Sequence, residues 1–132
     1  MNIQERAQMA AELKTNGKCN CCQAVTKVFA DKLSLSEQEL ENLSAGFLAG
    51  MGCMEATCGA LIGANIIAGL YTKGNFSAKS ARELLSRFKE KCGATICKEL
   101  KGLETKKVLC ECPDCVKNAV LSLGEVISLD NE

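Results

Sequence analysis

The chain has 132 residues, which fits a single domain over residues 1–132, and 47% of them are apolar, enough for a hydrophobic core. Its 16 basic and 16 acidic residues cancel, and only 4% of residues are aromatic. These values argue against nucleic-acid binding, which needs a basic surface and stacking rings. The longest apolar run, residues 64–70, is far shorter than the roughly 18 residues of a membrane span. No apolar signal segment follows Met1, so we expect a cytoplasmic protein.

The patterning predicts helices separated by short turns. Four of the helices are expected over residues 3–15, 22–32, 57–72 and 80–91. Another helix starts at Ser36, a short helical turn follows Thr95, and the last helix starts at Pro113. Ser36 with Glu39, and Ser80 with Glu83, have the spacing of capping boxes. The helix over 57–72 is apolar nearly all round, which is typical of the centre of a bundle. Since no window alternates polar and apolar residues as a strand would, we expect an all-α bundle of about six helices.

Gly59 and Gly63 lie one turn apart in the predicted helix over 57–72. Small residues at this spacing allow another backbone to approach closely, at a cost of about 1 kcal/mol per glycine relative to alanine. We interpret them as tight helix packing, which would also let the backbone approach a bound cofactor. The same small-residue face is compatible with a homodimer.

Ten cysteines and no histidine are the most unusual feature of the composition. Because cytoplasmic thiols stay reduced, this number indicates metal binding or thiol chemistry rather than disulfides. The lack of histidine excludes mixed Cys/His zinc sites and Cys–His catalytic pairs. The cysteines form four groups at predicted helix ends or turns: Cys19/Cys21/Cys22, Cys53/Cys58, Cys92/Cys97 and Cys110/Cys112/Cys115. The free N–H groups of a helix N-terminus stabilise a thiolate or a thiolate-bound cluster.

Four segments carry a resemblance to a known family: CCQAV (21–25), CGALIGA (58–64), ICKEL (96–100) and CPDCVKNAV (112–120). Together they resemble the C-GCAxxG-C-C family of redox-active proteins, over about residues 17–123. The resemblance assigns the family's four cysteines to Cys21, Cys58, Cys97 and Cys112, and its glycine motif to Gly59 and Gly63. It implies a small helical cytoplasmic protein, mostly of anaerobes, with a redox role.

Six further cysteines go beyond the family's pattern and flank its positions: Cys19, Cys22, Cys53, Cys92, Cys110 and Cys115. They are candidates for additional ligands of an enlarged site or of a second one. An ordinary buried cysteine is the alternative for each of them.

Three hypotheses follow from these residues. In the first, the four family cysteines converge at one end of the bundle and hold an iron–sulfur cluster, [4Fe–4S] or [2Fe–2S], with room for a second. The protein would then serve electron transfer to a redox partner, or redox sensing. In the second, Cys112-Pro113-Asp114-Cys115 is the C-P-x-C motif of a thiol–disulfide oxidoreductase, although the βαβ pattern of such folds is missing. In the third, the thiolates bind zinc or another soft metal. We favour the first, and a redox or metal-binding protein over a stand-alone enzyme.

Overall fold

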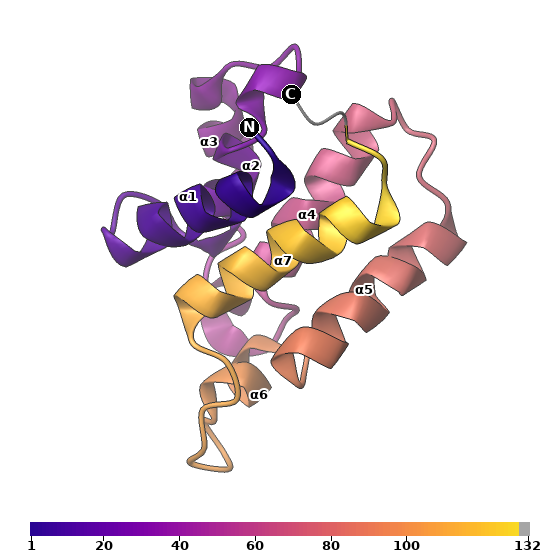
Figure 1. Ribbon diagram of the computed structural model, residues 1–132. Coiled ribbons are helices and arrows are strands. Elements are labelled where there is room, and N and C mark those ends of the chain that lie inside the picture. Colours follow the sequence, from indigo (N-terminus) through magenta and orange to yellow (C-terminus); the bar gives the residue numbers. More distant parts are fainter. Residues whose placement is uncertain (130–132) are drawn as a thin grey trace.

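The computed structural model describes residues 1–129 and consists of helices joined by short turns (Figure 1). In chain order these are α1 (Ile3–Thr15), α2 (Cys21–Lys27), the 3-10 helix η1 (Ala30–Lys32), α3 (Glu37–Ser44), the π-helical turn η2 (Gly50–Met54), α4 (Gly59–Tyr71), α5 (Ala78–Cys92), α6 (Cys97–Lys101) and α7 (Cys112–Val126). Six helices have seven or more residues, and residues 1–129 form no strand, so the predicted all-α fold is confirmed. No helix among them is long and apolar enough to cross a membrane.

Local capping sets the start of α3 where the sequence predicts it. The Ser36 hydroxyl accepts from the N–H of Glu39, and the Glu39 carboxylate accepts from the N–H of Ser36, which is the predicted capping box. The predicted start at Ser80 is wrong. Ser77 caps α5 instead, because its hydroxyl accepts the N–H of Ser80 at 3.1 Å and the helix begins at Ala78.

The predicted continuous helix over residues 22–32 is also wrong, because α2 ends at Lys27 and η1 follows after a short break. The buried guanidinium of Arg6 explains the break. Its Nη1 donates to the carbonyl oxygen of Val28 at 2.5 Å, so this carbonyl has a partner without a continuing helix. The end of α2 therefore depends on a residue of α1, since Arg6 lies 22 residues before Val28.

Helix α7 is the centre of the bundle. It packs against α1, α2, α4 and α5, and Figure 1 shows it lying between α1 and α5. Its apolar stripe, Val116, Ala119, Val120 and Leu123, is completely buried. The N-terminal end of α7 reaches the end of the molecule where α5 finishes and α6 lies.

Helix α4 packs closely on α2 through the two predicted glycines. A Cβ atom on Gly63 would lie 3.0 Å from the carbonyl oxygen of Cys22, and one on Gly59 would overlap the carbonyl oxygen of Phe47. Both glycines therefore permit close approach of backbones within the chain. Because this small-residue face is buried inside the protein, the predicted homodimer would need another surface.

Arg6 forms an ion pair that ties α1 to the segment after α2. Its side chain is 2% exposed, and Nη1 and Nη2 donate to the two carboxylate oxygens of Asp31 at 2.6 and 2.8 Å. The guanidinium also lies 5.2 Å from the ring centroid of Phe29. The hydrogen bonds from Arg6 lower the pKa of Asp31.

We expect Asp31→Asn to reduce the free energy of unfolding by about 1–2 kcal/mol. This is less than the roughly 3–5 kcal/mol of a fully buried pair, because Asp31 is 57% exposed and solvent screens the pair. Since the folded-state pKa is the lower one, the stabilisation is complete above the unfolded pKa of about 3.9 and is lost as the pH falls through the folded value. Denaturant unfolding of both proteins across pH measures this. The prediction is contradicted if the difference in unfolding free energy between the two proteins stays constant until Asp31 is fully protonated.

Candidate metal centre

Five cysteines line one cavity of about 300 Å³. Cys115 is one of them, and the other four come from distant parts of the chain: Cys21, Cys58, Cys97 and Cys112. They come from α2, the start of α4, α6 and α7, and they are the four residues that the family resemblance assigns. We call this site the four-cysteine cavity. The rest of its wall is largely apolar, including Leu48, Met54 and Leu100, while Lys14 and Lys101 supply positive charge.

A short backbone pairing holds two of these cysteines side by side. Thr57 and Ile96 form an isolated antiparallel bridge. Next to it, the N–H of Cys58 donates to the carbonyl of Thr95 at 2.8 Å, and the N–H of Cys97 donates to the carbonyl of Ala56 at 3.0 Å. The starts of α4 and α6 are therefore fixed next to each other, although they are far apart in the sequence.

Cys58 is the N-cap residue of α4, and its sulfur is placed to carry negative charge. A hydrogen bond from the thiol of Cys115 lowers the pKa of Cys58 to about 7 against the opposing effect of burial. The backbone N–H groups of Ala60 and Leu61 lower it further. The helix N-terminus expected from the sequence thus acts on this thiol.

Two other cavity thiols, those of Cys21 and Cys97, have raised pKa values. Burial raises the pKa of Cys21 to about 11, and the nearby charge of Cys58 adds to this effect. Burial also raises the pKa of Cys97, while the charge of Lys101 partly offsets it. Because a metal binds thiolates, metal binding here would release protons.

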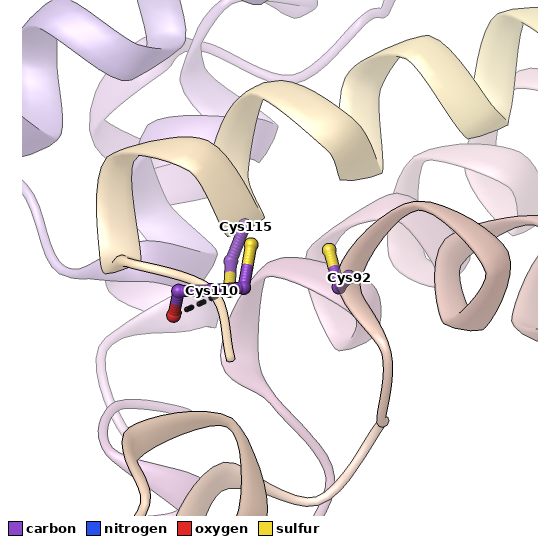
Figure 2. Close-up of side chains that lie close together, drawn as sticks. All are labelled: Cys92, Cys110 and Cys115. Carbon is purple, nitrogen blue, oxygen red and sulfur yellow. Dashed lines mark hydrogen bonds between the residues drawn. The ribbon is translucent and has the colours of Figure 1, made fainter. Parts of the chain in front are cut away.

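A second group of thiols adjoins the cavity. The sulfur atoms of Cys92, Cys110 and Cys115 all lie within 4.8 Å of one another and are buried, so they could hold a metal ion. Figure 2 shows that Cys92 comes from the end of α5, Cys110 from the segment before α7, and Cys115 from the first turn of α7. We call them the three-cysteine group. All three belong to the cysteines beyond the family's pattern.

Hydrogen bonds organise the three-cysteine group. The Asn118 side-chain amide donates to the sulfur of Cys92 at 3.4 Å and to that of Cys110 at 3.9 Å. A hydrogen bond from the thiol of Cys115 lowers the pKa of Cys92 to about 6, against the effect of burial. Burial raises the pKa of Cys110 to about 12. The thiol of Cys115 donates to the carbonyl oxygen of Cys110 at 3.6 Å (Figure 2), and the neighbouring sulfurs of Cys58 and Cys92 raise its pKa.

Cys115 connects the two sites, since it lines the four-cysteine cavity and belongs to the three-cysteine group. The three remaining cysteines lie outside both. Cys19 and Cys22 are buried, with Cys22 packed against α4, whereas Cys53 is exposed and its thiol lies 3.7 Å from the carbonyl of Gly50. Of the two glycines predicted to approach a cofactor, Gly59 lines the cavity and Gly63 does not.

Sequence reasoning missed Lys14, Lys101 and Asn118. The two lysines come from unrelated helices, and nothing local marks them as cavity residues. Asn118 follows Cys115 by three positions on α7, so helical spacing was the available signal for it.

Fold and thiol geometry together define an all-α, cysteine-rich protein with buried thiols that could bind a metal. Residues 19–126 match the family model described as "Putative redox-active protein (C_GCAxxG_C_C)". The chain belongs to this C-GCAxxG-C-C family, which confirms the resemblance seen in the four cysteine segments. Comparison with curated proteins and with solved structures returned no significant match.

Proposed function

We propose that the protein binds an iron–sulfur cluster in the four-cysteine cavity and serves electron transfer or redox sensing. The observation that carries this proposal is the convergence of Cys21, Cys58, Cys97 and Cys112 on one cavity. Four cysteine thiolates are the usual ligand set of [2Fe–2S] and [4Fe–4S] clusters. The cluster would supply one-electron chemistry, and the protein would supply ligands and surroundings.

The surroundings suit an anionic cluster. Cluster sulfurs and thiolates accept hydrogen bonds, and the N–H groups of Ala60 and Leu61 at the start of α4 lower the pKa of Cys58. Lys14 and Lys101 line the same cavity, so their charges would offset part of the negative charge of four thiolates. The apolar remainder of the wall would limit access of water.

Anaerobic purification and reconstitution with iron and sulfide test the proposal. We expect visible sulfur-to-iron charge-transfer absorption, matched iron and sulfide contents, and an EPR signal from one oxidation state of the cluster. Zinc without visible absorption would favour the zinc alternative instead. A colourless protein without bound metal would contradict both the iron–sulfur proposal and the zinc alternative. The thiol–disulfide alternative would then be left, and a disulfide-exchange assay of Cys112→Ser tests it.

A further inference from the structure

We propose that the three-cysteine group is a second metal site, next to the four-cysteine cavity, for one thiophilic closed-shell ion, Cu(I) or Zn(II). Its residues are Cys92, Cys110 and Cys115, and none of the family's four cysteines belongs to it. The site therefore goes beyond the proposed iron–sulfur function and does not depend on it.

The geometry is close to that of a three-thiolate site. Metal–sulfur bonds of about 2.3 Å in a trigonal arrangement place the sulfurs about 4 Å apart. The three sulfurs already lie within 4.8 Å of one another, so binding requires only a small contraction. Two of the ligands have limited freedom: Cys115 lies in the first turn of α7, and the N–H of Cys110 is bonded to the carbonyl of Leu100 at 3.4 Å.

Donor type selects the ion. The group consists of thiols alone, and no carboxylate in the described part of the chain joins it within the same distance. Soft thiolate donors favour Cu(I) and Zn(II) over harder cations such as Mg²⁺ or Ca²⁺. Three thiolates complete the coordination of Cu(I), whereas Zn(II) would add one ligand from solvent to reach four.

An outer shell and an access route are also present. Asn118 donates to two of the three sulfurs, as expected of a partner that orients thiolate ligands. Cys110 lines a surface depression of about 410 Å³, together with Asn118, Lys91 and Lys117. Glu111 and Asp114 line the same depression, so its charges are mixed. The depression lets an ion enter without passing through the four-cysteine cavity.

The test uses full-length Cys97→Ser/Cys112→Ser protein, in which the cavity ligand set is broken and the three-cysteine group is intact. The reduced, metal-free protein is titrated anaerobically with Cu(I) and, separately, with Zn(II), each against a competing chelator. We expect one equivalent of at least one ion to bind. Adding Cys110→Ser should weaken binding by more than roughly 10- to 100-fold, since even outer-shell partners contribute that much. Adding Cys53→Ser, the matched change at an exposed cysteine outside both sites, should leave it unchanged.

Circular dichroism shows whether each variant keeps its helices, and Cys92→Ser replaces Cys110→Ser if the latter does not fold. Absence of binding in the starting variant would overturn the proposal, as would equal binding with and without Cys110. One equivalent of Cu(I) or of Zn(II), bound more weakly once Cys110 is replaced, supports the proposal. Failure of the iron–sulfur proposal is seen separately, as a lack of iron in the unchanged protein.

Discussion

Cys58→Ser is expected to remove iron from the anaerobically reconstituted protein, with more than a roughly 10-fold loss of bound iron and of visible absorption. Cys58 has the most ligand-like surroundings in the four-cysteine cavity. It stands at the N-cap position of α4, and its pKa is lowered to about 7, chiefly by the thiol of Cys115 and further by the backbone N–H groups of Ala60 and Leu61. A serine hydroxyl keeps the size of the side chain but offers a hard oxygen that is almost fully protonated, so it is a poor ligand for iron.

Cys53→Ser is the matched control, because Cys53 precedes Cys58 by five positions but is exposed and lines neither site. We expect wild-type iron content for this variant. Iron and sulfide analysis, together with absorption spectra, measures the cluster content of both variants. Equal iron content in Cys58→Ser and Cys53→Ser would contradict the ligand role of Cys58.

Gly59→Ala is expected to destabilise the fold by about 3 kcal/mol, at the upper end of overpacking effects. Its Cβ would overlap the carbonyl oxygen of Phe47 and lie 3.5 Å from the backbone nitrogen of Cys22. These neighbours are backbone atoms, which have no other rotamer to adopt, so α4 itself must move. Because Gly59 directly follows Cys58, this movement should also lower iron content.

Gly69→Ala is the control on the same helix. Nothing lies within 4 Å of a Cβ atom at Gly69, so alanine fits and should stabilise α4 by about 0.5–1 kcal/mol. Denaturant unfolding of metal-free protein measures both effects. The interpretation of Gly59 as a close-contact residue fails if its alanine variant is as stable as that of Gly69.

Features that depend on neighbours in the sequence were the most predictable. The capping box of Ser36 and Glu39 is formed within one turn, so the sequence contains all of it. At α5 two nearby serines, Ser77 and Ser80, compete for the same role, and the pattern favoured the wrong one. The buried face of α7 is equally local, because Val116, Ala119, Val120 and Leu123 recur at helical spacing and are all buried.

The set of cysteines in the cavity was predictable for a different reason. Cys21, Cys58, Cys97 and Cys112 came from the family resemblance, and their place at helix starts agreed with it. No spacing in the sequence shows that they share a cavity. Their proximity depends on the pairing of Thr57 with Ile96 and on the packing of α7, which are contacts between distant segments.

By itself, then, the sequence determined the helical class, the family and the four cysteines, because composition, periodicity and motif order are local properties. Only the tertiary structure decided that α2 stops at Lys27, where Arg6 satisfies the carbonyl of Val28. It also decided that Cys115 lies between two sites and that Cys92 and Cys110 accompany it. The end of α5 and the start of α7 meet only when the bundle is packed. That packing brings together three thiols, of which the first and the last, Cys92 and Cys115, are 23 positions apart in the sequence.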